Sequence, residues 1–130
     1  MNTHWSDRYV GRVYEAGAFD CGDLAELVAR EVFGRAIALP SVHGRGGAQR
    51  QAVIDAAKSA CAEPIAKPCD GDAVLIVARG YGQHVGIYCV IEGEPWVLHN
   101  VRTAGAIRTR LRHMGLLGYS IEGYYRWASK

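Results

Sequence analysis

The chain lacks any long hydrophobic run. In its 130 residues, no stretch approaches the roughly 20 consecutive apolar residues of a membrane-spanning helix, so we expect no membrane span. The first fifteen residues carry several charged side chains and contain no apolar segment of the kind that a signal peptide needs. We therefore expect cytoplasmic synthesis without a signal peptide. A target at the cell envelope would have to be reached by another route, such as a larger particle or a loss of the envelope.

The sequence also lacks a large charge excess and a C-x-x-C pair. Its formal net charge of +2 is too small to indicate nucleic-acid binding. The four cysteines are scattered, and a domain of this size does not need disulfides, so we expect all four to be reduced. Cys61, Cys69 and Cys89 are interpreted as core or partly buried thiols. Because the close ligand spacing of zinc sites is absent, we expect no zinc site. No other metal or cofactor is expected either.

Acidic residues are missing from one further segment. Between Arg102 and Arg112 the chain has four arginines and no aspartate or glutamate. Such a segment is either a solvated face or a binding strip for an anionic polymer or for substrate carboxylates. The solvated face is the preferred interpretation.

No repeat, low-complexity tract or linker divides the chain, so residues 1–130 are expected to form a single domain. Residues 1–20 have little regular pattern and are predicted as a loop. From Cys21 to Phe33 apolar residues recur with a period of 3.6, which predicts a helix that stops at Gly34. A second helical stripe runs from Val53 to Cys61, and this helix is expected to end near Glu63-Pro64.

Four strands are predicted in the second half of the chain. Ala73–Ala78 is a continuous apolar run, and Tyr124–Trp127 is a last short strand. Between them, His84–Ile91 and Trp96–Val101 flank a turn at Glu92–Pro95. Helices followed by a meander of strands indicate an α+β domain, with N-terminal helices packed on an antiparallel sheet.

Two histidines are predicted to share one face of this sheet. His84, Gly86 and Tyr88 alternate toward the same side of their strand. If Glu92–Gly93 is a two-residue turn, Gly86 lies opposite His99 on the next strand. His99 then becomes the diagonal neighbour of His84, on the same face and within reach of its ring.

Cys21 begins the first predicted helix, directly after Asp20, a plausible N-cap. The N-terminus of a helix carries partial positive charge and free N–H donors, which favour a thiolate over a thiol. A nearby imidazole can accept the thiol proton, and a second polar group can orient that imidazole. The layout therefore predicts nucleophilic chemistry at a thiol.

Four short blocks, taken in order, resemble the NlpC/P60 cysteine peptidases, particularly their phage-tail-associated branch. The blocks are Phe19-Asp20-Cys21, Asp70-Gly71-Asp72, His84-Val85-Gly86-Ile87-Tyr88 and Val97-Leu98-His99. The resemblance runs from about Arg8 to Trp127 and implies a compact papain-like fold. It also implies hydrolysis of amide bonds in the peptide stems of bacterial peptidoglycan, commonly next to D-glutamate and diaminopimelate. The partners it implies are the stem peptide and other proteins of a phage or prophage tail.

The resemblance also implies roles for individual residues. Cys21 would be the nucleophile, His84 the general base, and His99 the third member that orients His84. Asn100 is an alternative third member, because some related thiol hydrolases use asparagine there. The other histidines are expected at the surface: His4, His43 and His113.

Two details near the nucleophile extend this comparison. The family places a tyrosine upstream of the cysteine, near the thiolate and the oxyanion; Tyr9 fits by distance, and Tyr14 is the alternative. The family usually has Ser-Gly or Trp-Gly after the cysteine, whereas this chain has Gly22-Asp23. A carboxylate so close raises the pKa of a thiol by repulsion, which would reduce activity.

Two other functions fit the same sequence features. One is a structural component of a tail tip, in which the fold is kept and catalysis is weak or lost. The other is a thiol amidase or acyltransferase on the same fold, which would cut the sugar–peptide amide or move an acyl chain. Alkylation of Cys21 separates the first from the peptidase, and analysis of the products separates the second.

Overall fold

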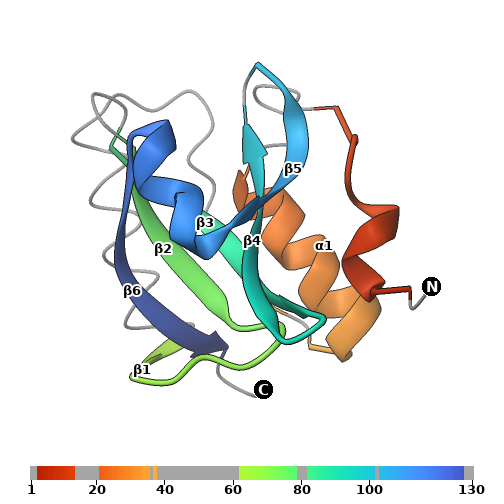
Figure 1. The fold of residues 1–130 in the computed structure, drawn as a ribbon. Coiled ribbons are helices and arrows are strands. Elements are labelled where there is room, and N and C mark those ends of the chain that lie inside the picture. The colour runs from red at the N-terminus through yellow and green to blue at the C-terminus, as the bar shows by residue number, and fades with distance from the viewer. Residues whose placement is uncertain are drawn as a thin grey trace.

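The computed structural model describes residues 3–13, 21–35, 37, 62–78, 82–101 and 103–127. Within these residues one α-helix packs against a six-stranded antiparallel sheet, so the α+β prediction is confirmed (Figure 1). The elements are η1 (Trp5–Arg8), α1 (Cys21–Phe33), β1 (Ala62–Ile65), β2 (Ala73–Ala78), β3 (Gly82–Ile91), β4 (Glu94–Val101), β5 (Gly105–Arg110), η2 (Leu111–Leu117) and β6 (Tyr119–Trp127). The strand order is β1-β6-β2-β3-β4-β5. Most of the second helix predicted from the sequence lies outside the described residues, but its expected end near Glu63-Pro64 is wrong, because these residues belong to β1.

Helix α1 begins and ends at the predicted residues. The side chains of Leu24, Ala25 and Val28 are buried, because the 3.6-residue period places them on one side of the helix. Gly34 follows with φ of 65°, a left-handed conformation that glycine adopts without steric cost and that ends many helices. None of the helices in the described part of the chain is long and apolar enough to cross a membrane.

The strands extend beyond the predicted ones. β2 has the predicted bounds, whereas β3 and β4 each begin two residues early and β6 begins five residues early. β1 and β5 were not predicted. β1 has only four residues and contains Pro64, and β5 includes Arg108 and Arg110, so neither carries a clear apolar signal.

The hairpin between β3 and β4 turns at Glu92 and Gly93, as predicted. Their φ angles are 52° and 77°, the left-handed pair that suits a two-residue hairpin turn. The turn pairs Ile87 with Leu98. This is the register from which Gly86 was expected to lie opposite His99, and the ladder itself ends at Ile87 and Leu98.

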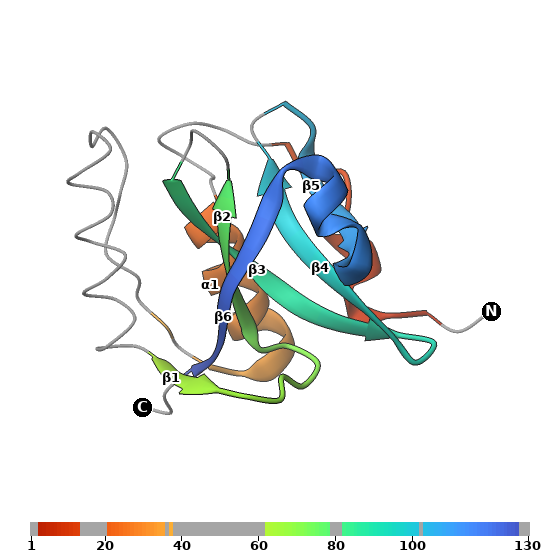
Figure 2. The ribbon, with the colours of Figure 1, turned by 60° about the vertical axis from the view of Figure 1, so that its left-hand side comes forward.

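The sheet has two covered faces. On the face that we call the α1 face, a buried cluster joins α1 to the strands: Tyr9, Leu24, Ala25, Val28, Ala29, Ala73, Ile87, Cys89, Leu98, Ala106 and Trp127. On the opposite face, the η2 face, Met114 of η2 packs against three residues of the sheet: Val74, Ile76 and Val97. Figures 1 and 2 show α1 and η2 on opposite sides of the sheet.

The N-terminal segment, described over residues 3–13, is more ordered than the predicted loop, and the rest of that prediction lies outside the described residues. It contains η1 and then lies along β5, where the amide of Gly11 donates to the carbonyl of Ala106 at 2.7 Å. The amide of Ala106 in turn donates to the carbonyl of Arg12 at 2.8 Å. Gly105 permits this approach, because a Cβ there would overlap the Arg12 carbonyl. The segment thus covers an otherwise open edge of the sheet.

Candidate functional site

Cys21 is the first residue of α1. The helix begins at the end of the sheet where β3 starts and β4 finishes (Figures 1 and 2). This end also carries His84, the third residue of β3, and His99, the sixth of β4. The Cys21 side chain lies outside what the structure describes, so its contact with His84 stays a prediction.

His84 and His99 contact one another. Their ring centroids are 5.6 Å apart and the planes meet at 78°, an edge-to-face arrangement. The prediction that the two histidines share a face of the sheet is therefore confirmed.

A third ring, from Tyr119 of β6, completes this cluster. It is nearly parallel to His84, with centroids 5.6 Å apart and a 29° angle. It is edge-on to His99, at 5.4 Å and 88°. Sequence reasoning missed Tyr119, because it precedes the predicted start of the last strand and nothing local links it to a histidine.

His99 is fully buried. Its Nε2 atom lies 3.1 Å from Oγ1 of Thr109, and its buried Nδ1 atom has no hydrogen-bond partner in the described part of the chain. Burial, aided by the charge of nearby His84, lowers the pKa of His99 to about 3. At neutral pH His99 is thus an uncharged ring that can orient a neighbour without repelling it.

The two candidates for the third member of the site lie on opposite faces of the sheet. His99 faces η2, together with His84 and Tyr119. Asn100 is 2% exposed and pairs with Ala106, which belongs to the cluster around α1. Because successive residues of a strand alternate, Asn100 faces α1 and His99 does not.

Tyr9 does not lie where the resemblance implies. Its buried hydroxyl donates to Oε1 of Glu31 at 2.8 Å and accepts from Nη2 of Arg8 at 2.7 Å. Glu31 follows Cys21 by ten residues of α1, which corresponds to about 15 Å along the helix axis. The Tyr9 hydroxyl thus forms structural hydrogen bonds near the C-terminal end of α1, away from Cys21. The alternative, Tyr14, lies outside the described residues.

The two other described cysteines differ from each other. Both are free; Cys89 is buried, and burial raises the pKa of its thiol to about 12. Cys69 is exposed, so its expected partial burial is wrong. Cys61 lies outside the described residues. Across the described ranges, no three His, Cys, Asp or Glu side chains are grouped to hold a metal ion.

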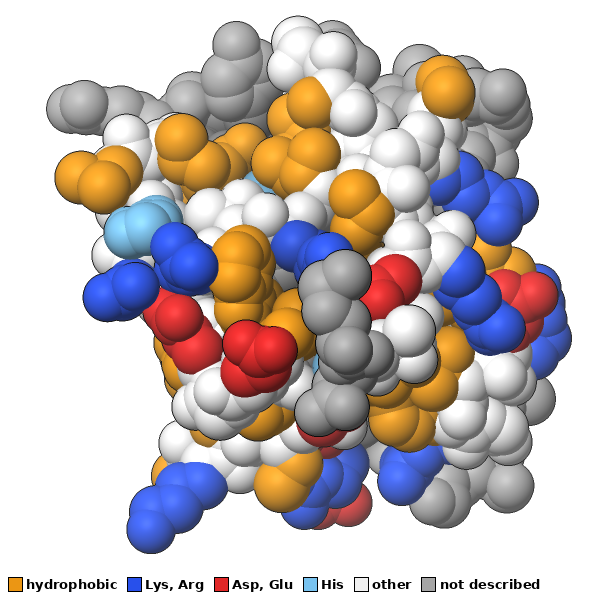
Figure 3. Space-filling model, turned by 45° about the vertical axis from the view of Figure 1, so that its right-hand side comes forward, with side chains coloured by type: hydrophobic (Ala, Val, Ile, Leu, Met, Phe, Trp, Pro, Cys, Tyr) orange, Lys and Arg blue, Asp and Glu red, His pale blue; other side chains and the backbone are white. Residues whose placement is uncertain are grey.

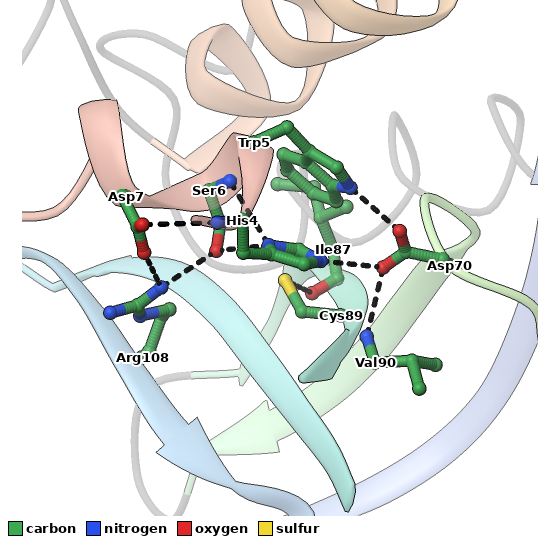
Figure 4. Close-up of polar contacts among 9 residues, drawn as sticks. All are labelled: His4, Trp5, Ser6, Asp7, Asp70, Ile87, Cys89, Val90 and Arg108. Atoms are coloured by element: carbon green, nitrogen blue, oxygen red, sulfur yellow. Dashed lines mark hydrogen bonds and ion pairs between the residues drawn. The ribbon is translucent and has the colours of Figure 1, made fainter. Parts of the chain in front are cut away.

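Polar contacts of Asp70 connect the N-terminal segment to the end of β3 (Figure 4). Its carboxylate accepts from the amide of Val90 at 2.8 Å and from Nε1 of Trp5 at 2.7 Å. It also lies 3.1 Å from Nε2 of His4, whose Nδ1 lies 2.7 Å from Oγ of Ser6. Ser6, His4 and Asp70 are the residue types of a hydrolase triad, but Ser6 is fully buried and cannot reach a substrate. His4 is thus a structural link whose side chain is partly buried and partly exposed.

The rest of the Asp70-Gly71-Asp72 motif is also structural. Asp72 accepts two hydrogen bonds from Arg126, from Nε at 3.1 Å and from Nη2 at 2.9 Å. This pair ties the start of β2 to the end of β6. Gly71 has φ of 98°, and a Cβ there would overlap the Phe33 ring.

The described arginines of the basic segment are paired with acids from elsewhere in the chain. The ion pairs are Arg108 with Asp7, Arg110 with Glu94 and Arg112 with Glu94. In Figure 3, basic and acidic side chains lie next to each other on the visible face. This arrangement favours the solvated face over a binding strip. Arg102 lies outside the described residues.

No known protein-family model matches this chain, and a search of curated proteins finds no significant match. The likeness to a peptidase family thus depends on the sequence blocks alone.

Proposed function

We propose that this protein is a cysteine peptidase that hydrolyses amide bonds in the peptide stems of bacterial peptidoglycan, on a papain-like NlpC/P60 fold. We further propose that it acts at the cell envelope as part of a phage or prophage tail. One observation carries the proposal. His84 and His99 are in ring contact at the end of the sheet where α1 begins, and Cys21 is the first residue of α1.

The proposed reaction uses the thiol as nucleophile and the imidazole as acid and base. His84 accepts the Cys21 proton, and the thiolate attacks the carbonyl carbon of the scissile amide. His84 then gives that proton to the leaving amine, and an acyl-enzyme remains. In the second half, His84 takes a proton from water, whose oxygen attacks the thioester and releases the acid and the Cys21 thiol.

The charges around the start of α1 act in opposite directions. The helix N-terminus favours the Cys21 thiolate. Asp23, in the same first turn, disfavours it by repulsion. His99 stays uncharged, so it adds no repulsion when His84 becomes an imidazolium.

A second function is favoured by a different observation. His84 and His99 lie on the η2 face, whereas α1 packs on the opposite face. A sheet that separates the thiol from both imidazoles would weaken or abolish catalysis. This arrangement therefore suits a tail component that keeps only the fold.

Digestion of purified sacculi tests the proposal. Wild type and Cys21→Ala are compared, with mass spectrometry of the released fragments and Cys89→Ala as the matched cysteine control. The peptidase predicts cleaved stem peptides from wild type and Cys89→Ala, and none from Cys21→Ala. Fragments cut at the sugar–peptide amide would indicate the amidase, and no release by wild type would favour the structural component.

A further inference from the structure

We propose that Tyr119 is a positioning residue, which holds the imidazole rings of His84 and His99 in their relative orientation. The effect on catalysis rests on the proposed peptidase function. The effect on the rings does not, and it can be measured separately.

The contacts place Tyr119 against both histidines. Its ring is nearly parallel to that of His84 and edge-on to that of His99, with centroid distances of 5.6 and 5.4 Å. Both distances lie within the range of favourable aromatic pairs. The residues come from β6, β3 and β4, and β2 lies between β6 and β3 in the sheet. Tyr119 therefore reaches across a strand to make these contacts.

Position along the strands explains this reach. Ile76 of β2 pairs with His84 on one side and with Ile121 on the other. Tyr119 is two residues before Ile121 and so lies on the same face, diagonal to His84. Gly118, with φ of 83°, ends η2 just before it and turns the chain into β6.

The histidines need such a support. The torsion that rotates an imidazole about its Cβ–Cγ bond has broad minima, so hydrogen bonds or packing must set the ring angle. His99 has a polar contact at Nε2 with Thr109, while its Nδ1 has no hydrogen-bond partner among the described residues. The Tyr119 ring contacts both imidazoles and so limits the rotation of both at once.

Tyr119 also suits the charge that the reaction creates. When His84 accepts the thiol proton it becomes a cation, and the face of an aromatic ring attracts a cation. The near-parallel ring of Tyr119 offers that face to His84. His99, kept uncharged by burial, does not oppose it.

The test compares Tyr119→Leu with Tyr119→Phe, which keeps the ring. Tyr124→Leu is the matched control, because Tyr124 lies on the same strand and face but contacts Tyr88, at 5.9 Å. The readouts are the nuclear Overhauser contacts between the imidazole C–H groups of His84 and His99, which depend on the relative orientation of the two rings, and kcat and KM on a purified stem peptide. We expect Tyr119→Leu to change these contacts and to lower kcat about tenfold to a hundredfold, with KM unchanged. Tyr119→Phe and Tyr124→Leu should resemble wild type in both readouts.

Unchanged contacts between the two imidazoles in folded Tyr119→Leu would overturn the proposal. If that variant does not fold, Tyr119→Met, with a flexible apolar side chain, is judged by the same criteria. If the wild-type protein has no hydrolytic activity but the contacts between its imidazoles respond to Tyr119→Leu as expected, the peptidase is rejected and the role of Tyr119 in ring orientation is upheld.

Discussion

Thr109 holds His99 from the neighbouring strand, with 3.1 Å between the hydroxyl Oγ1 and the imidazole Nε2. The contact lies in the interior, since His99 is fully buried. A threonine hydroxyl can donate or accept, so it fits either neutral tautomer of the ring. The hydroxyl gives His99 a fixed place but no countercharge, so burial and the nearby charge of His84 keep the pKa of His99 low.

Stability should therefore depend on pH through His99. Its pKa is about 3 in the folded protein and about 6.5 in an unfolded chain, so the unfolded state binds more protons between these values. The contribution is complete above pH 6.5 and is lost as the pH falls toward 3. From pH 7 to 4.5 the loss should be about 2.5 kcal/mol. Urea unfolding of wild type and His99→Gln at both pH values measures it, and equal losses in the two proteins would contradict the assignment.

The thiols should differ in reactivity. Brief treatment of the folded protein with iodoacetamide at pH 7, followed by peptide mass spectrometry, should label Cys21 fastest because thiolates are the reactive species. Cys69 should react at the ordinary rate of an exposed thiol. Cys89 should stay unlabelled, because it is buried and its pKa is about 12. Labelling of Cys21 no faster than of Cys69 would argue against an activated nucleophile.

Gly71→Ala should destabilise the fold more than Gly93→Ala. Both glycines have left-handed backbones, so each alanine costs about 1–2 kcal/mol in strain. At position 71 the new methyl group would also overlap the Phe33 ring, whereas at position 93 it would meet no atom within 4 Å. Thermal unfolding of both variants tests this difference. Equal melting temperatures would show that Phe33 moves aside at little cost.

Arg108→Ala should loosen the N-terminal segment. Its Nη1 donates to Oγ of Ser6 at 3.0 Å and also pairs with Asp7, so its removal frees η1 from β5. Hydrogen exchange at the amides of η1 should become faster. Arg112→Ala, which removes an exposed arginine paired with Glu94, is the control and should leave these amides unchanged.

The same two variants test the basic segment as a binding strip. If the segment is a solvated face, neither variant changes binding to sacculi at low or high salt. If both variants bind sacculi more weakly than wild type, and the loss of binding is largest at low salt, the segment is a binding strip, because salt screens a surface attraction.

Sequence reasoning succeeded where one local signal dominated. The 3.6-residue period and Gly34 were enough for α1, and the apolar run was enough for β2. The turn at Glu92 and Gly93 set the register that brings His84 and His99 together. Each of these features depends on a few neighbouring residues.

It failed where the partner is distant in the chain. Asp70 appeared as part of a peptidase motif, but it binds Trp5 and His4, more than sixty residues away. Tyr9 fitted the family by spacing, yet Glu31 holds its hydroxyl. Spacing along a chain does not reveal which side chain will compete for a hydrogen bond in the folded state.

The pairing of Gly11 and Arg12 with Ala106 has a consequence for synthesis on the ribosome. Gly11 and Arg12 must wait for β5, which is translated more than ninety residues later. Until then, the sheet edge that this segment covers does not exist. Contacts of such long range slow folding, and they make the two halves of the chain fold together. In a nascent chain stalled before β5, the backbone of Gly11 and Arg12 would therefore lack its partner and be open to proteases and chaperones.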